Sequence, residues 1–500
     1  MVSNLLTFVN SNVEWSKSIK IQIKEPFSDY FICTLKMTKT GHLICLGGPT
    51  DSQSIGPQSY VIEFGDNRLM IDCGLAMGQK GKTYSPDLGP IMNRSLNGVL
   101  TTHGHLDHVG YIPALTKENP LLKDGSRIYG TIITNEITKM MLVDALKNDT
   151  PYFGFMDVIR TLNRFEAISP LNQFEPVPGF KVTAIPVGHV PGAVSFLIEL
   201  PSGKKGLILG DASFVDQLIV KGALPISDWK DEWIPDELWG IDLTNTEETE
   251  QLSFNESIES LVGAVRADLS EGRNVFIMAF ANGKAQNAAL ALSQAGIECW
   301  LDGMTQEVYK IFRDNKTNDN DIEFPEIGDS SRIRFVNDVG RSNLLSRSGP
   351  KVIITTGGMG DRGPIVQYMQ AFLPEESASF YATSWLAHGS IASKLLKIVQ
   401  KYPAEGENRN KRQIRITDER NGESTNVPIR AKVQKIGLTG HCRFSELKDF
   451  ISRLCARRGR IVDNIVLTHG SIHSMRKAVV DLRPFTQNII FGLPGTTVDI

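Results

Sequence analysis

The chain has 500 residues, of which 41% are hydrophobic and 22% charged, and its formal net charge is −3 at pH 7. This length suggests two or three domains with large cores, and no apolar stretch reaches the roughly 20 residues that a membrane span needs. The small negative charge excludes a global attraction to nucleic acid, so such binding would need a local basic groove. Six cysteines without paired spacing and no signal-peptide pattern predict reduced thiols in a cytoplasmic protein.

Short strands dominate the first half of the chain. Residues 1–40 hold two weak strand-like runs, and we assign them to a small N-terminal extension. Residues 41–245 form a first domain with one clear helix, Ile132–Leu146. Its expected strands are Leu43–Leu46, Ser59–Glu63, Arg68–Asp72, Val99–Thr102, Arg127–Gly130, Lys181–Pro186, Ala193–Leu200 and Lys205–Leu209.

Strands and helices alternate from residue 246 onward, which is typical of parallel βαβ units. We therefore expect a doubly wound domain over residues 246–427, with Pro403–Val427 as a polar hairpin or exposed loop. The alternating elements are Ser257–Leu269, Asn274–Phe280, Lys284–Gln294, Cys299–Asp302, Thr305–Arg313, Lys351–Thr355, Pro364–Phe372, Ser379–Thr383 and Ala392–Lys401. Residues 428–500 return to the first domain if a histidine there completes a site begun near residue 103.

The most informative stretch is Thr102-His-Gly-His-Leu-Asp-His108, which directly follows an apolar run. Clustered ligands at the end of a strand are typical of a metal-binding loop. In an extended approach His103 and His105 point the same way and can share one cation, while Asp107 and His108 can serve a second. The alternative is a His-rich surface turn, which leaves unexplained why three of nine histidines fall here beside an aspartate.

Other ligand-type residues also stand just beyond short aliphatic runs. They are Asp72, His189, Asp211 and His469. Taken alone, each is better explained as a strand-end turn residue or a buried histidine. Together they suffice for two three-ligand sets with a bridging residue, which favours a two-metal site.

These motifs, in this order, resemble the β-CASP nucleases of the metallo-β-lactamase fold, a family that includes RNase J and the pre-mRNA 3′-end cleavage nucleases. The histidine loop alone marks only the hydrolase superfamily. Three further blocks are similar to the β-CASP pattern, namely Asn274–Gln286, Trp300–Met304 and Thr356–Pro364. The resemblance implies an α/β fold, a metallo-β-lactamase αββα sandwich with an inserted doubly wound α/β β-CASP domain.

The resemblance also implies a role for each site residue. Asp72 would orient ligands rather than bind metal. The first zinc ion would be held by His103, His105 and His189, and the second by Asp107, His108 and His469, with Asp211 bridging. Asp242 and His441 fall at the acidic and histidine motifs of the β-CASP pattern. Nitrogen and oxygen ligands, with no cysteine among them, suit Zn²⁺ in hydrolytic sites, so two Zn²⁺ ions are expected, with Mn²⁺ left open.

The expected chemistry is phosphodiester hydrolysis. Two ions about 3.5–4 Å apart would clamp a phosphate oxygen and activate a bridging water as hydroxide. His441, held by Asp242, would protonate the departing 3′-oxygen, although each taken alone is explained as a turn or loop residue. Substrate phosphates would meet two glycine-rich loops near helix starts. The residues in these loops are Gly358, Met359, Arg362, His388, Gly389 and Ser390.

Several positions depart from the family pattern and bear on the substrate. Lys284 replaces the usual arginine, Ser471 replaces the usual glutamate, and Asp228–Glu250 is unusually acidic. The DNA-directed branch tends to lack a histidine where His469 stands, so the resemblance favours single-stranded RNA, cut in endonuclease or 5′-exonuclease mode. The alternatives are a DNA nuclease of the same fold, a non-catalytic RNA-binding subunit of a processing complex, and a small-molecule hydrolase. No membrane partner is expected, and a homodimer is left open.

Overall fold

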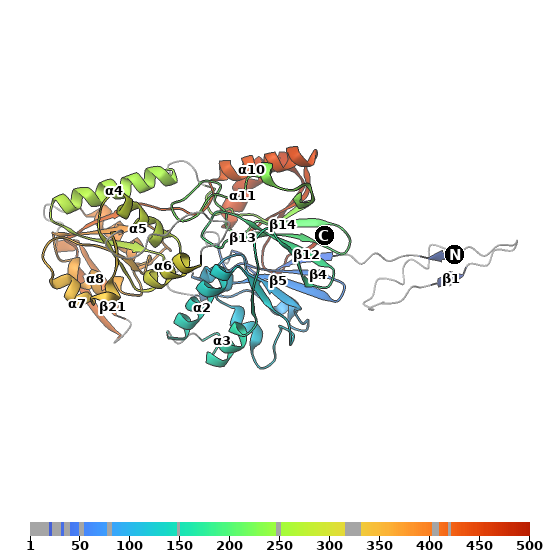
Figure 1. Ribbon diagram of the computed structural model, residues 1–500, viewed down its shortest axis with the longest axis horizontal. Helices are drawn as coiled ribbons and strands as arrows, with labels where there is room; N and C mark the ends of the chain where they lie inside the picture. Colours follow the sequence, from blue (N-terminus) through green and yellow to red (C-terminus); the bar gives the residue numbers. More distant parts are fainter. Residues whose placement is uncertain are drawn as a thin grey trace.

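The computed structural model describes residues 20–22, 32–34, 41–49, 55–77, 83–147, 151–246, 252–315, 332–402, 410–418 and 422–500. Two stacked sheets form one half of the molecule and a third sheet forms the other half (Figure 1). The predicted N-terminal extension lies outside the described residues, except for β1 (Lys20–Gln22) and β2 (Ile32–Thr34), which pair antiparallel. None of the described helices has the length and apolar character needed to traverse a bilayer.

The first sheet of the sandwich has seven strands in the order β10-β9-β8-β5-β4-β3-β26. Strands β3, β4 and β5 pair antiparallel, whereas β5, β8, β9 and β10 run parallel. The bounds are β3 (Gly41–Cys45), β4 (Ser59–Phe64), β5 (Asn67–Cys73), β8 (Gly98–Leu100), β9 (Ile128–Gly130), β10 (Phe165–Ala167) and β26 (Thr497–Asp499). A small ribbon of β6 (Ala76–Met77) and β7 (Thr83–Tyr84) lies beside it.

The second sheet also has seven strands, in the order β11-β12-β13-β14-β15-β24-β25. The bounds are β11 (Gln173–Val177), β12 (Phe180–Pro186), β13 (Val194–Glu199), β14 (Lys205–Ile208), β15 (Glu237–Gly240), β24 (Val462–Leu467) and β25 (Thr486–Phe491). Helices α10 (Phe444–Arg458) and α11 (Ile472–Leu482) cover its outer face. Helices α1 (Leu106–Val109), α2 (Ile132–Lys147) and α3 (Phe155–Leu162) lie on the side of the first sheet (Figure 1).

Successive side chains of a strand point to opposite faces of the sheet, and in these strands both sets of side chains are apolar. In β5, Leu69 and Ile71 join the core between the two sheets, whereas Met70 packs into the outer core of the first sheet. Phe196 and Trp239 reach the same inter-sheet core from the second sheet. Strands with apolar residues on both faces suit a layered sandwich, so the αββα expectation is confirmed.

The third sheet has six parallel strands in the order β18-β17-β19-β16-β20-β23. Their bounds are β16 (Asn274–Ala279), β17 (Cys299–Asp302), β18 (Ile333–Phe335), β19 (Val352–Thr356), β20 (Ala378–Ala382) and β23 (Lys432–Lys435). Helices cover both faces, as expected for a doubly wound domain. One face packs on α4 (Phe254–Ser270), α5 (Lys284–Gln294) and α6 (Met304–Asp314), and the other on α7 (Arg341–Ser346), α8 (Ile365–Phe372) and α9 (Ile391–Lys401).

The C-terminal part of the chain shows that the third-sheet domain is an insertion. Strands β24 and β25 complete the second sheet, and β26 pairs with β3 in the first. However, β23 belongs to the third sheet, although we assigned residues from 428 onward to the first domain. Buried Ile429, Ala431 and Val433 continue the inserted core, so we place the return crossing after Lys435.

The polar tract between α9 and β23 also differs in part from its prediction. It forms a hairpin of β21 (Gln413–Asp418) and β22 (Glu423–Pro428), which fits the hairpin option. Its charged side chains are not all exposed, since Arg412 is only 4% exposed. The reason is that Ile414, Ile416 and Val427 alternate with polar residues and anchor the hairpin on the core of the inserted domain.

Candidate metal centre and substrate cleft

Each predicted ligand follows a strand that ends at the same edge of the sandwich. His103 and His105 follow β8, His189 follows β12, Asp211 follows β14 and His469 follows β24. Strands β14, β15 and β24 are parallel, and β12 has the same direction because both β12 and β14 are antiparallel to β13. Parallel strands deliver their following loops to one edge, which brings together residues that are hundreds of positions apart in the sequence.

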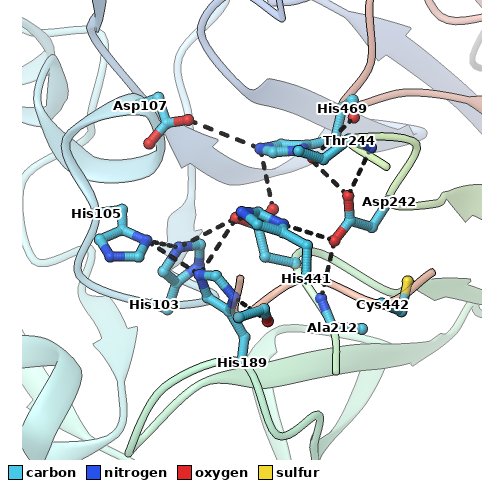
Figure 2. Close-up of polar contacts among 12 residues, drawn as sticks. His103, His105, Asp107, His189, Ala212, Asp242, Thr244, His441, Cys442 and His469 are labelled. Carbon is cyan, nitrogen blue, oxygen red and sulfur yellow. Dashed lines mark hydrogen bonds and ion pairs between the residues drawn. The ribbon is translucent and has the colours of Figure 1, made fainter. Parts of the chain in front are cut away.

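The first ligand set consists of three imidazoles whose nitrogens face one another (Figure 2). His103 Nε2 lies 2.9 Å from His105 Nδ1, and His189 Nε2 lies 3.1 Å from the same atom. Asp211 Oδ2 lies 3.5 Å from both His103 Nε2 and His189 Nε2. Burial lowers the pKa of His103 and His189 well below the usual range and that of His105 to about 4. The rings are therefore neutral, as metal ligands must be.

The second ligand set faces the other oxygen of the same carboxylate. Asp211 Oδ1 lies 3.3 Å from His108 Nε2 and 3.0 Å from His469 Nε2. Asp107 Oδ2 lies 3.7 Å from His469 Nε2. Burial lowers the pKa of His108 and His469, but the neighbouring carboxylates, Asp211 foremost, together outweigh burial and raise both, that of His108 to about 10. The carboxylates therefore favour positive charge at this point.

The donor atoms fit two cations. His108 Nε2, Asp211 Oδ1 and His469 Nε2 are buried and have no hydrogen-bond partner in the described part of the chain. Each such atom destabilises the fold by about 1–3 kcal/mol unless something satisfies it. The ligand atoms of each group lie within 4.8 Å of one another. Cations between them would satisfy the orphaned atoms and relieve the repulsion among the neutral imidazole nitrogens.

Asp72 lies behind the ligands, where its geometry fits the orienting role. Its Oδ1 and Oδ2 accept hydrogen bonds from the Thr102 backbone N (2.8 Å) and Oγ1 (2.7 Å). Its Oδ2 also lies 2.7 Å from His108 Nδ1, which leaves Nε2 of that ring for the metal position. The carbonyl of Gly440, 2.8 Å from His189 Nδ1, holds that ring in the same way. Such outer contacts fix the tautomer and the direction of the ligand rings.

Asp242 contacts both His441 and His469, a histidine of the second ligand set. Its Oδ2 lies 2.8 Å from His441 Nδ1, and its Oδ1 lies 3.5 Å from His469 Nδ1 (Figure 2). The backbone N of Ala212 and of Thr244 donate to the same carboxylate at 3.2 and 3.0 Å. Burial raises the pKa of Asp242, but His441 outweighs that effect and holds it well below the usual range. The link from Asp242 to His469 has no signal in the sequence, because the two positions are 227 residues apart.

The site opens into a cleft of about 1460 Å³ between the sandwich and the inserted domain. Four of the six predicted phosphate-binding residues line this cleft, namely Gly358, Met359, Arg362 and His388. Their phosphate-binding role stays a prediction. Asn282, Lys284, Trp385 and Lys435 also line it and were missed as site residues; Lys284 was noted only as a departure from the family pattern.

The structure corrects the prediction for Gly389 and Ser390, which do not line the cleft. Ser390 caps α9 instead, since its Oγ accepts a hydrogen bond from Ser393 N at 3.3 Å. Ile391 N donates to Asp361 Oδ1 at 3.1 Å, and Ala392 N donates to Met359 O at 2.9 Å. These amide groups at the helix start already have partners within the protein, so they are not available to a phosphate.

Two aspartates of the acidic stretch Asp228–Glu250 lie away from the cleft and pair with arginines of α10. Asp231 lies 3.0 Å from Arg457, and Asp236 lies 2.8 Å from Arg458. Neither aspartate lines the cleft. The repulsion of substrate that its composition suggests is therefore absent at these positions.

Comparison with known families agrees with this geometry. Residues 55–237 match the metallo-beta-lactamase superfamily, residues 282–395 the Beta-Casp domain, and residues 426–489 the Zn-dependent metallo-hydrolase RNA specificity domain. The chain belongs to the β-CASP family of the metallo-β-lactamase superfamily. Membership of this family, together with the His/Asp cluster, supports binding of divalent metal at the site.

The β-CASP chain is similar to several curated proteins along most of its length. Endoribonuclease YSH1 of Yarrowia lipolytica is 22% identical over 468 residues, which cover 88% of this chain and 51% of that protein. Transcription termination factor FttA of Methanosarcina mazei is 22% identical over 511 residues, which cover 96% of this chain and 74% of that protein. Cleavage and polyadenylation specificity factor subunit 3-I of Arabidopsis thaliana is 23% identical, with 85% and 58% covered. The chain thus spans about half the length of YSH1.

A solved structure shares the fold of the β-CASP chain. It is a protein of unknown function from Enterococcus faecalis V583, with a TM-score of 0.56 and 12% identity. The match covers 92% of this chain and 100% of that one. At this identity the likeness supports the fold alone.

Proposed function

We propose that this protein is a zinc-dependent ribonuclease that hydrolyses phosphodiester bonds of single-stranded RNA. The observation that carries the proposal is the position of Asp211. One of its oxygens faces His103 and His189, and the other faces His108 and His469, at the base of a large cleft. A carboxylate shared by two ligand sets is the arrangement that a two-metal hydrolase needs.

The ligand chemistry favours zinc. The donors are imidazole nitrogens and carboxylate oxygens, without cysteine, as in hydrolytic zinc sites. Two divalent ions bound there would supply an activated water and neutralise charge on the phosphate. Asp107 and Asp211 are the only carboxylates among the predicted ligands, so each ion would keep the Lewis acidity that draws a phosphate oxygen.

His441 is the residue that we propose as proton donor to the leaving oxygen. Its Nδ1 is held by Asp242 at 2.8 Å, and its ring lines the cleft. A carboxylate on Nδ1 leaves Nε2 available to the substrate and stabilises the protonated ring. His441 can therefore hold a proton where the departing ribose 3′-oxygen needs one.

RNA is the substrate that the comparisons favour. The C-terminal match is to an RNA specificity domain, and YSH1 is named an endoribonuclease. The full set of predicted ligands is present and convergent, which favours an enzyme over a silent subunit. A cytoplasmic location stays part of this proposal, since Cys45, Cys73, Cys299, Cys442 and Cys455 carry free thiols.

The test is an incubation of the purified protein with circular and linear single-stranded RNA and with single-stranded DNA of matching sequence. The linear RNA carries a 5′-monophosphate or a 5′-triphosphate. We expect cleaved circles, no DNA product, and about two zinc ions per chain by elemental analysis. Asp211→Asn is the matched control, since it keeps the side-chain shape and removes the bridging charge. A DNA-only product, or full activity in Asp211→Asn, would overturn the proposal.

A further inference from the structure

Two lysines on the inserted-domain wall of the cleft stand out because they lack counter-charges. Lys284 is the first residue of α5 and is half-buried, and Lys435 is the last residue of β23. Burial and then repulsion by Lys435 lower the pKa of Lys284 to about 8. No carboxylate of the described residues forms an ion pair with either lysine. The closest described partner of Lys284 is the ring of Phe280, 5.1 Å from its Nζ.

This arrangement is unfavourable for folding. A partly buried cation loses solvation, a second lysine repels it, and the start of a helix carries partial positive charge. Other half-buried lysines of the described chain have polar partners, as Lys204 with Glu237 Oε1 at 2.6 Å and Lys205 with the carbonyl of Glu232 at 2.8 Å. An unfavourable group that persists in a cleft is expected where function requires it.

The two lysines lie at the same edge of the third sheet, Lys435 at the end of β23 and Lys284 just beyond β16, with β20 between these two strands. In the register of the third sheet, Met278 of β16 lies opposite Ala382 of β20, which lies opposite Lys435 of β23. Lys284 opens the helix that follows β16. The loop that leads into this helix lies on the first ligand set, because the Asn282 carbonyl is 3.3 Å from His105 Nε2. The loop before Lys284 therefore contacts the first ligand set, and both lysines line the cleft into which that set opens.

We infer that Lys284 and Lys435 together bind one phosphate of the RNA strand beside the cleaved bond. This inference rests on the proposed ribonuclease function and identifies a subsite for it. A phosphodiester supplies the missing negative charge, relieves the repulsion between the lysines and is favoured at the start of α5. In this subsite the lysines position the substrate and take no part in the proton transfer.

A neighbouring tryptophan explains why the ligand is a nucleotide chain and not a free anion. Trp385 is 45% exposed and lines the cleft. It directly follows Ser384, whose Oγ accepts a hydrogen bond at 3.2 Å from the backbone N of Phe280, so it lies beside the loop that leads to Lys284. An exposed indole next to cations suits a base stacked beside its phosphate.

The first test compares Lys284→Met and Lys435→Met with Lys139→Met, a lysine on α2 paired with Glu136 at 3.7 Å and outside the cleft. Loss of a charged phosphate contact should raise KM for RNA roughly 10- to 100-fold. The kcat should change less than about threefold, since neither lysine touches the reacting atoms. Lys139→Met should match the unaltered protein.

The second test separates substrate binding from a structural role. Lys284→Met should keep or raise the melting temperature, because it removes an unpaired, half-buried charge; a structural lysine would give a lower one. RNA with a single uncharged methylphosphonate linkage, moved along the strand, should bind the unaltered protein weakly at one position. With the uncharged linkage at that position, Lys284→Met should bind the RNA no more weakly than the unaltered protein does.

These outcomes distinguish the two proposals. Normal RNA cleavage with an unchanged KM in both lysine variants, or additive losses in the methylphosphonate series, would overturn the phosphate subsite alone. Absence of RNA cleavage by the zinc-loaded unaltered protein would overturn the ribonuclease proposal itself.

Discussion

At the scale of single residues, one carboxylate connects the proposed proton donor to the metal centre. Asp242 contacts His441 at 2.8 Å and His469 at 3.5 Å. Thr244 supports the same histidine, with its Oγ1 2.8 Å from His469 Nδ1. His441 Nδ1 lies 3.8 Å from Asp211, farther than its 2.8 Å contact with Asp242. Substitutions at the two positions should therefore have different effects.

We expect His441→Ala to lower kcat by the 10²- to 10⁴-fold that is typical of a lost general acid, while about two metal ions per chain remain bound. Asp242→Asn should lower both kcat and metal content, because it also releases His469. Steady-state kinetics and elemental analysis on the same preparations measure both quantities. Loss of metal from His441→Ala would contradict the separation of the two roles.

The low pKa of Lys284 predicts a pH dependence of RNA binding. Lysine is charged below its pKa and neutral above it, so the attraction to phosphate is present below about pH 8 and is lost as the pH rises through that value. Burial lowers this pKa most, and the charge of Lys435 on β23 lowers it further. We expect KM for RNA to rise between about pH 7 and about pH 9, a range well below the usual lysine pKa.

Lys284→Arg is the matched control for this profile, since arginine stays charged throughout the range. Its KM should be nearly independent of pH. An equal rise of KM in the arginine variant would show that another group titrates.

At the scale of secondary-structure elements, strand ends aim the site residues through unusual backbone angles. Among the described non-glycine residues, positive φ occurs at Asp72 (55°), Leu171 (65°) and His469 (39°). Two of the three belong to the candidate site, at the ends of β5 and β24. Left-handed conformations are costly for such residues, so the surrounding packing must hold them there.

The close approach of β5 to α1 gives a test at this scale. A Cβ on Gly74 would lie 1.7 Å from the Asp107 carbonyl oxygen and 2.7 Å from His108 N. Gly74→Ala should therefore shift α1 and weaken metal binding at least about tenfold, by analogy with lost ligand support, while circular dichroism stays unchanged. Gly263→Ala in α4 is the control, because its Cβ would meet nothing within 4 Å. Equal metal affinity in both variants would contradict this packing argument.

At the scale of the whole molecule, the metal sites join segments from both sheets of the sandwich. The loop after β8, the ends of β12 and β14, and the return segment at β24 all meet at Asp211. Bound cations should therefore stabilise the fold as a whole and not one loop.

We expect a chelator to lower the melting temperature and added Zn²⁺ to restore it. A site that holds ligand at 100 times its Kd contributes about 2.7 kcal/mol to stability. The melting temperature of Asp211→Asn should respond little to chelator or to added Zn²⁺, because its two ligand sets would lack the carboxylate charge that they share. Differential scanning calorimetry measures these shifts, and identical melting temperatures with and without chelator would argue against bound structural cations.

Much of this architecture follows from local signals in the sequence. Short apolar runs place β5 and β12, and the strand–helix rhythm after residue 245 predicts the parallel third sheet. The position of each ligand just beyond an aliphatic run predicts that the ligands meet at one sheet edge. These features are readable because they depend on residues that are close together in the chain.

The tertiary structure alone decided which atoms face each other. It assigns each oxygen of Asp211 to a different histidine set, joins Asp242 to His469, and sets Lys284 beside Lys435. It also places β23 in the inserted domain and turns Ser390 into a helix cap. The physical reason is that such contacts depend on how segments distant in the sequence pack, and no local periodicity encodes the distance between two side chains that only the folded core brings together.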